Sequence, residues 1–246
     1  MKMDRTLLLA HPKYIFDVDG TLTPSRGEID KKFAVWFSKF CESHECYLVT
    51  GSDKPKTLEQ VGPVIYNRAK NVYQCGGNEK WQGDTLLHTN DIELSYQLKK
   101  DLCSALEESK FKHKTGKGHI EIRSGLINFS ILGRPASSMT RDLYVKHDQF
   151  TNERQTICQD LSWDHDKYQF SVAGETGIDI TYQGMTKAQI LNNFSDADKI
   201  YFFGDKTGFG GNDHEIANAV IDRGKNNKAF TIDGWQHTWN ILKQLG

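Results

Sequence analysis

A chain of 246 residues, 37% of them hydrophobic, can bury a core in one large domain or two smaller ones. Its net charge of −1 gives no general attraction to nucleic acid or to a membrane surface, and we expect neither as a partner. Five scattered cysteines indicate reduced thiols, and residues 1–9 do not resemble a signal peptide, so we expect a cytoplasmic protein.

The N-terminal third alternates strands and helices. Buried strands are predicted at residues 14–16, 46–49 and 71–75, and helices at residues 28–43 and 56–61, the second broken at Gly62 and Pro63. This order predicts a parallel sheet with right-handed crossovers.

The middle of the chain has an α+β character. We predict a charged helix at residues 91–110 capped by Asn90, a hairpin, two further helical stretches and two strands. From Thr186 the α/β pattern returns, with helices predicted at residues 187–194 and 214–222. We therefore predict a doubly wound, Rossmann-like α/β core with an inserted α+β cap domain; the core takes residues 1–82 and 185–246, and the cap residues 83–184.

Two acidic clusters follow predicted core strands. Asp17 and Asp19 emerge after residues 14–16, and an extended strand would point both the same way. Asp205 follows the strand at residues 199–203, with Asn212 and Asp213 a few positions later. Because parallel strands end at the same sheet edge, Asp17, Asp19 and Asp205 can bind Mg²⁺ together, with Asn212 and Asp213 orienting the site.

Other polar residues occur at the same predicted edge. Thr50 and Ser52 end the second strand, where they can bind a phosphate oxygen or simply cap the turn. Lys187 opens a helix, where it can neutralise a nucleophile and a phosphoryl group or lie exposed on the surface.

These motifs resemble those of the haloacid-dehalogenase-like phosphotransferases, and the long insert resembles their type IIB cap. In more detail, residues 17–24, 202–207 and 210–216, with 120–125 in the insert, are similar to the eukaryotic-type phosphomannomutases. The resemblance implies Asp17 as nucleophile, Asp19 as general acid and base, and Lys187 as the third catalytic residue. It also implies five substrate-binding residues: Arg26, Arg123, Arg134, Arg141 and Asp179.

The chain departs from this family at several positions. Gly177 replaces a serine that usually contacts the sugar, and Thr50 replaces a glycine, a change more typical of the phosphatase relatives. Ala217 and Ala219 provide no ligand for a second cation.

The resemblance implies an isomerase that interconverts mannose 6-phosphate and mannose 1-phosphate, with Mg²⁺ and a hexose 1,6-bisphosphate activator. It also implies a homodimer formed through the cap. The arginines agree with this activity, because a mutase has to bind a second phosphate and guanidinium groups suit that task. The alternatives are a Mg²⁺-dependent sugar-phosphate phosphatase and an inactive sugar-phosphate sensor; the acidic residues and Lys187 argue against the sensor.

Overall fold

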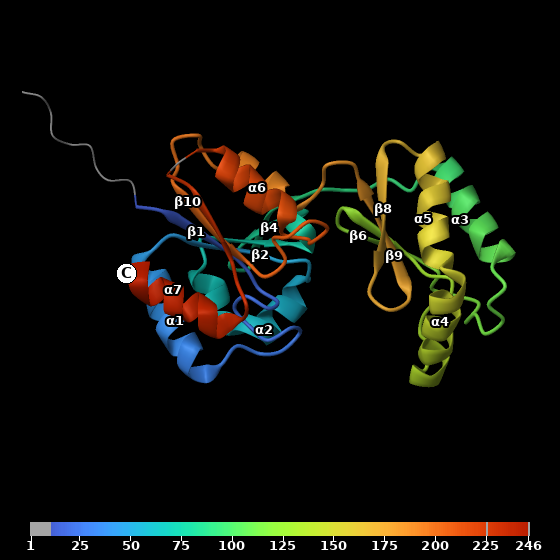
Figure 1. Cartoon of the computed structure of the whole chain (residues 1–246), viewed down its shortest axis with the longest axis horizontal. Helices are drawn as coiled ribbons and strands as arrows, with labels where there is room; N and C mark the ends of the chain where they lie inside the picture. Colours follow the sequence, from blue (N-terminus) through green and yellow to red (C-terminus); the bar gives the residue numbers. More distant parts are fainter. Residues whose placement is uncertain (1–10, 225, 246) are drawn as a thin grey trace, which may run out of the picture. The chain divides into compact units, whose positions relative to one another are not determined.

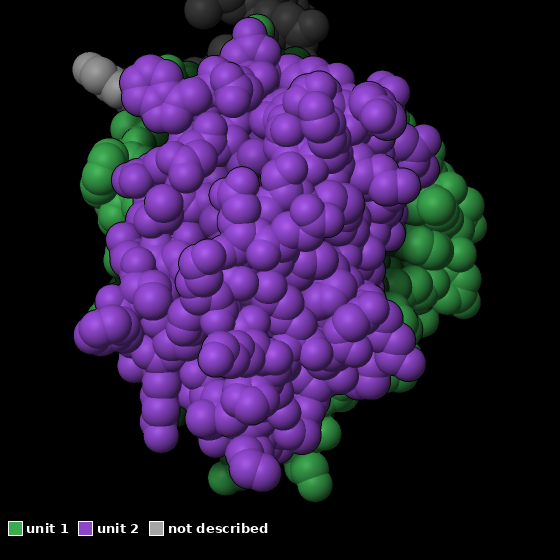
Figure 2. All heavy atoms as spheres, turned by 90° about the vertical axis from the view of Figure 1, so that its right-hand side faces the viewer, with its two compact units in different colours: residues 1–88, 186–246 green, residues 89–185 purple. Residues whose placement is uncertain are grey.

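The computed structural model describes residues 11–224 and 226–245, and the chain divides into two compact units. Unit 1 combines Met1–His88 with Thr186–Gly246, and unit 2 is Thr89–Met185, as coloured in Figure 2. Residues 1–9, where we expect no signal peptide, lie outside the described part of the chain. No helix in the described part is long and apolar enough to cross a membrane.

Among the described residues, unit 1 is built on a seven-stranded sheet in the order β11-β10-β1-β2-β3-β4-β5. The first five strands in this order are parallel, and β4 pairs antiparallel with β3. The winding direction reverses at β1, which is where open α/β sheets bind ligands. The strands are β1 (Lys13–Asp17), β2 (Cys46–Val49), β3 (Asn71–Gln74), β4 (Glu79–Gln82), β5 (Thr85–Thr89), β10 (Ile200–Gly204) and β11 (Lys228–Thr231).

Helices cover both faces of this sheet, as Figure 1 shows. One face packs against α1 (Lys31–Ser43), α2 (Lys54–Arg68) and α7 (Trp235–Leu245). The other packs against the 3₁₀ helix η2 (Lys187–Asn193) and α6 (His214–Asp222), and a short 3₁₀ turn, η1 (Cys75–Gly77), follows β3.

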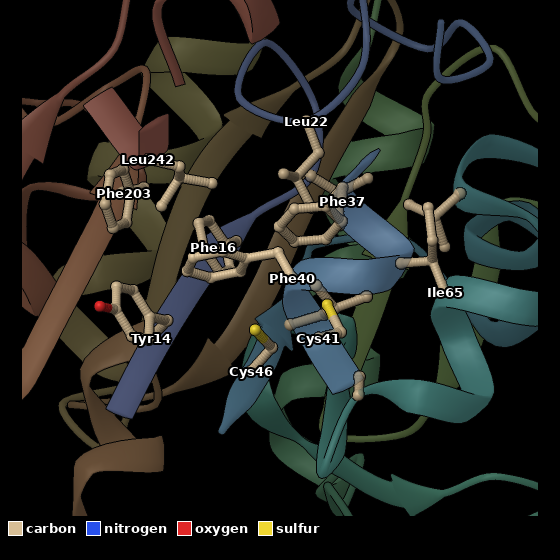
Figure 3. Close-up of a cluster of buried hydrophobic side chains, with 14 of the residues drawn as sticks. Tyr14, Phe16, Leu22, Phe37, Phe40, Cys41, Cys46, Ile65, Phe203 and Leu242 are labelled. Atoms are coloured by element: carbon tan, nitrogen blue, oxygen red, sulfur yellow. The ribbon is translucent and has the colours of Figure 1, made fainter. Parts of the chain in front are cut away.

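The position of β1 is determined by the core around Phe16. This ring is fully buried, and its centroid lies 4.9 Å from that of Phe203 on β10 and 5.0 Å from that of Phe37 on α1. The three side chains are labelled in Figure 3. Because successive strand residues alternate between faces, Ile15 joins the opposite core. Packing on both faces fixes the end of the strand, where Asp17 lies.

In unit 2, the described residues form a four-stranded antiparallel sheet in the order β6-β7-β9-β8. Its strands are β6 (Ile120–Arg123), β7 (Leu126–Phe129), β8 (Tyr168–Ala173) and β9 (Gly177–Tyr182). Helices α3 (Tyr96–Glu108), α4 (Ser138–Thr151) and α5 (Glu153–Asp164) pack on its apolar face. Most of the alternating positions bear polar side chains, among them Glu121, Asn128 and Asp179, so the other face of the sheet is largely polar. The predicted fold class, a doubly wound α/β core with an inserted α+β domain, is confirmed.

The structure differs from the prediction at the start of unit 2. We expected the cap at residues 83–184, but unit 1 extends to His88. The reason is that β4 and β5 continue the large sheet as neighbouring strands. All residues of β5 are exposed, so they lack the buried pattern that predicts a core strand.

The predicted helix at residues 91–110 is also shorter. It begins as α3 at Tyr96, and Ser95 caps it by accepting from the Leu98 N–H, so the prediction of Asn90 as the cap was wrong. The preceding segment is held outside the helix by two tyrosines. The Glu93 N–H donates to Tyr182 Oη, and Tyr168 Oη donates to the Glu93 carbonyl. Such tertiary contacts override a local capping signal.

Candidate active site

The acidic residues of unit 1 meet at the carboxyl ends of β1 and β10, which are adjacent parallel strands. Asp17 is the last residue of β1, Asp205 follows β10 directly, and Asp213 precedes α6. Asp17 and Asp213 are buried, whereas Asp205 is half-buried. Asp205 also lines a cavity of about 470 Å³, together with residues that include Gly20 and Trp235.

The carboxylates of Asp17, Asp205 and Asp213 form a candidate metal site. One oxygen from each lies within 4.8 Å of the others. Hard divalent cations such as Mg²⁺ prefer this all-oxygen donor set, and the mutual repulsion of three carboxylates favours a bound cation. The residues present therefore fit such an ion. Asp213, expected only as a supporting residue, is a member of the cluster. Asn212, the other expected supporting residue, is exposed.

Lys187 joins two of these carboxylates. Its Nζ donates to Asp17 Oδ1 and to Asp213 Oδ1, both at 2.6 Å, and its side chain is only 4% exposed. Burial by itself lowers the pKa of Lys187, but the attraction of the two carboxylates outweighs it and raises the pKa. The residue is therefore a buried, charged ammonium group.

Asp17 has a strongly perturbed pKa, raised from 3.8 to about 7. Burial is the main cause, and the neighbouring carboxylates of Asp213 and Asp205 raise the pKa further, while Lys187 opposes them. Burial followed by repulsion from Asp213 also raises the pKa of Asp205. Strongly perturbed groups in a cleft are typical of catalytic sites.

Gly20 allows the two acidic segments to approach each other. It has a positive φ of 76°, and a Cβ at this position would overlap the Asp205 carboxylate. The close neighbour of this backbone is therefore the side chain of Asp205.

The prediction that the Asp19 carboxylate belongs to the metal cluster does not agree with the structure. Its Oδ1 accepts from the Arg26 N–H at 2.6 Å and from Gln60 Nε2 at 2.8 Å, and Asp19 is not a member of the carboxylate group. The prediction assumed an extended strand through Asp19. However, β1 ends at Asp17, and the chain then turns, with three N–H groups donating to the Val18 carbonyl.

The remaining predicted residues of unit 1 lie on loops. Thr50 is buried at the end of β2, next to β1, and its Oγ1 accepts from the Ser52 N–H at 3.1 Å. This bond is the turn cap that the sequence left open as an alternative. Arg26 is exposed and has a positive φ of 57°.

In unit 2, the polar face of the sheet carries a continuous network of charged groups. Arg123 donates to Glu121 at 2.7 Å, and Arg134 Nη1 lies 3.9 Å from the same carboxylate. Arg134 also donates to Asn128 Oδ1 at 2.7 Å, and Asn128 Nδ2 donates to Asp179 at 2.6 Å. The network brings together three of the predicted substrate residues.

Arg141 lies apart from this network, donating to Glu175 at 2.9 Å. Burial raises the pKa of Asp179 in spite of the Asn128 hydrogen bond and the nearby arginines. The Arg123 hydrogen bond lowers the pKa of Glu121.

Sequence reasoning missed Gln60, Glu121 and Asn128. Glu121 and Asn128 face each other across β6 and β7, and each lies among apolar residues of its strand. That alternation is a signal for a polar sheet face and could have identified both. Gln60 gives a weaker signal, because it is one of two polar residues, with Thr57, on the buried side of α2.

Comparisons with known proteins identify both the family and the fold of this chain. A family model for eukaryotic phosphomannomutase matches residues 34–244. A phosphomannomutase of Triticum aestivum is 33% identical over 210 residues, covering 82% of this chain and 84% of the relative. Phosphomannomutase 1 of Dictyostelium discoideum is 32% identical over 245 residues, covering 94% and 95% of the two chains.

Solved structures extend the likeness to the fold. A haloacid dehalogenase-like hydrolase from Bacteroides thetaiotaomicron superimposes with a TM-score of 0.60 at 13% identity, covering 96% of this chain and 100% of the other. A sugar phosphatase of HAD subclass IIB has a TM-score of 0.55 at 14% identity, covering 96% and 99%. The fold is that of the HAD superfamily. Because the family model and the named relatives match most of the length of this chain, the chain belongs to the eukaryotic phosphomannomutase family of enzymes.

Proposed function

We propose that this enzyme interconverts mannose 6-phosphate and mannose 1-phosphate through an aspartyl phosphate on Asp17 and a hexose bisphosphate. Family membership and the names of the relatives support the reaction. The observation that carries the chemistry is the buried Asp17 carboxylate, paired with Lys187 and gathered with two further carboxylates.

In the proposed first step, an oxygen of Asp17 attacks the phosphorus of a sugar phosphate. The new O–P bond forms as the bond to the sugar oxygen breaks, and the electron pair of the broken bond stays on that oxygen. Asp19 donates a proton to the leaving oxygen and later accepts one from the attacking hydroxyl. Lys187 offsets negative charge on Asp17 and keeps its carboxylate oriented.

Asp17, Asp205 and Asp213 would hold the divalent cation, for which we propose Mg²⁺. When bound, the ion supplies positive charge that offsets the phosphoryl group and the carboxylates. Gly20 leaves room for Asp205 in this cluster.

A mutase must also bind the phosphate that is not being transferred. We propose that Arg123, Arg134 and Arg141 bind it, and that Asp179 contacts a sugar hydroxyl. We propose Arg26 separately as a further substrate-binding residue. In the polar network, Arg123 and Arg134 share the Glu121 carboxylate, so both guanidinium groups are already oriented on one face. A monophosphatase has no need for such a clamp.

The test is to incubate the enzyme with mannose 1-phosphate, Mg²⁺ and a trace of hexose 1,6-bisphosphate, the proposed activator. We expect hexose 6-phosphate to accumulate with little inorganic phosphate. Release of inorganic phosphate without hexose 6-phosphate would refute the mutase assignment.

The alternative function is a Mg²⁺-dependent sugar-phosphate phosphatase, in which water attacks the phosphorylated Asp17. The buried hydroxyl of Thr50, where the family usually has glycine, favours this outcome. The same incubation separates the two functions, because only a mutase returns the phosphoryl group to a sugar.

We further propose that the enzyme works in the cytoplasm and forms a homodimer through unit 2, as the family resemblance implies. Light scattering coupled to size-exclusion chromatography tests the dimer, and a mass of one chain at micromolar concentration would contradict it.

A further inference from the structure

Gln60 is a buried polar residue next to the proposed active site, and the reaction outlined above assigns it no role. It lies on α2 with 1% of its surface exposed. Its Nε2 donates to Asp19 Oδ1 at 2.8 Å and lies 3.4 Å from Thr23 Oγ1. Its Oε1 is buried and, among the described residues, has no hydrogen-bond partner.

An interruption of α2 fixes the backbone of Gln60. Gly62 has non-helical dihedral angles (φ 75°, ψ 158°) and Pro63 has no N–H, so the regular pattern of helical hydrogen bonds stops here. The Gln60 carbonyl accepts instead from the Ile29 N–H at 2.8 Å. The residue is thereby connected by its backbone to the loop that follows Asp19.

The half-satisfied amide indicates a role other than stability. A buried acceptor without a partner is costly, and an apolar side chain of the same length would avoid that cost. The orientation of the amide is nevertheless determined by Asp19, because a flipped amide would place Oε1 against the carboxylate.

Both hydrogen bonds that the Asp19 carboxylate accepts from described residues end on the same oxygen. The Arg26 N–H and Gln60 Nε2 both donate to Oδ1. An oxygen that accepts two N–H donors is a poor place for a proton, so the proton of the acid form belongs on Oδ2. The two donors hold the carboxyl group by Oδ1 and leave Oδ2 without a donor among the described residues.

We propose that Gln60 is a positioning residue that keeps the proton of Asp19 on Oδ2, where it is given to the oxygen leaving phosphorus. The inference rests on the proposed role of Asp19. In that step the P–O bond breaks, its electron pair stays on the leaving oxygen, and that oxygen takes the Oδ2 proton as the new bond to Asp17 forms.

The test compares two substrates with different leaving groups. An alkyl phosphate, such as a hexose phosphate, leaves as an alkoxide that needs the proton, whereas acetyl phosphate leaves as acetate and needs none. The variant is Gln60→Met, which keeps the side-chain length without a donor. The control is Thr57→Val, three residues earlier on the same helix; Thr57 is equally buried, and its hydroxyl donates only to the Asp53 carbonyl among the described residues.

For Gln60→Met we expect kcat with the alkyl phosphate to fall by about 10- to 100-fold. This loss is smaller than the whole contribution of general acid catalysis, because Asp19 itself remains in place. We expect KM to change less than about twofold. The rate at which acetyl phosphate phosphorylates Asp17, measured in a single turnover, should change less than about threefold, since nucleophilic attack does not use Gln60, whereas the later dephosphorylation uses Asp19 with either substrate. Thr57→Val should leave the ratio of the two rates unchanged. Thermal unfolding should show Gln60→Met to be at least as stable as the wild type.

An equal loss on both substrates, or no loss on either, would overturn the proposal, since the first indicates general distortion and the second no role. The alkyl substrate is the phosphate ester that the wild-type enzyme turns over fastest. If the enzyme proves to be a phosphatase, the mutase proposal is refuted, but the comparison of the two substrates still tests the role of Gln60. A wild type that turns over no alkyl phosphate would overturn both.

Discussion

Replacing the proposed nucleophile should make the metal-free protein more stable near neutral pH. The substitution is Asp17→Asn, which keeps the shape of the side chain and removes its charge. The folded pKa of Asp17, about 7, lies above its ordinary value of 3.8, so the folded protein holds this proton more tightly than the unfolded chain. That linkage stabilises the wild type below about pH 4, and the stabilisation is lost as the pH rises through about 7.

The magnitude follows from the same pKa values. One pKa unit corresponds to about 1.4 kcal/mol, so a rise from 3.8 to about 7 means that ionising Asp17 costs the folded state about 4 kcal/mol. Asparagine avoids this cost, but its NH₂ lies beside Lys187, and an unsatisfied buried donor costs about 1–3 kcal/mol. We therefore expect the variant to be more stable by about 1–3 kcal/mol at pH 8.

The assay is urea denaturation in the presence of EDTA at several pH values between 8 and 5. The advantage of Asp17→Asn should shrink steadily as the pH falls, because the wild type then recovers its proton. A variant less stable than the wild type at pH 8, or a difference that does not change with pH, would refute the reasoning. Asp196→Asn is the control, since that carboxylate is fully exposed and its substitution should matter by less than about 0.5 kcal/mol at every pH.

Three further substitutions test other parts of the structure. Gly20→Ala should weaken Mg²⁺ binding by about tenfold or more in calorimetric titration, because the added Cβ overlaps Asp205; Gly184→Ala, with a similar φ of 77° and no atom nearby, should not. Arg134→Ala should raise KM for a hexose bisphosphate by about tenfold or more while leaving acetyl phosphate hydrolysis intact, and an unchanged KM would contradict its role. Arg154→Met should destabilise unit 2 by about 3–5 kcal/mol in thermal unfolding, because it removes the charged partner of the half-buried Asp148 carboxylate and the donor to three carbonyl groups; a loss below about 1 kcal/mol would contradict this.

The sequence was most informative where a residue's role depends on local pattern. Asp17 and Asp205 follow short apolar runs, and the rule that parallel strands end at one edge was enough to bring them together. Helix α6, predicted at residues 214–222, has the same bounds in the structure. In each case the signal lies within about ten residues of chain.

The sequence failed where the outcome depends on tertiary contacts. Asp19 was placed with the metal ligands because a strand has a period of two, but the backbone turns immediately after β1. The start of α3 was misplaced because Tyr168 and Tyr182, distant in sequence, hold Glu93 outside the helix. Gln60 donates to Asp19 although the two residues are 41 positions apart in the sequence, and no local pattern predicts a contact over that separation.

The charges of the carboxylate cluster explain how a proposed nucleophile that is so costly to ionise can be retained. Asp17, Asp205 and Asp213 carry three negative charges when ionised, and Lys187 supplies one positive charge, which leaves two negative charges uncompensated. A single divalent cation balances that excess. Without one, the cheapest relief is a proton on Asp17, as its pKa of about 7 indicates. The repulsion that lowers the stability of the metal-free fold therefore favours cation binding, and a bound cation in turn favours the ionised carboxylate that attack on phosphorus requires.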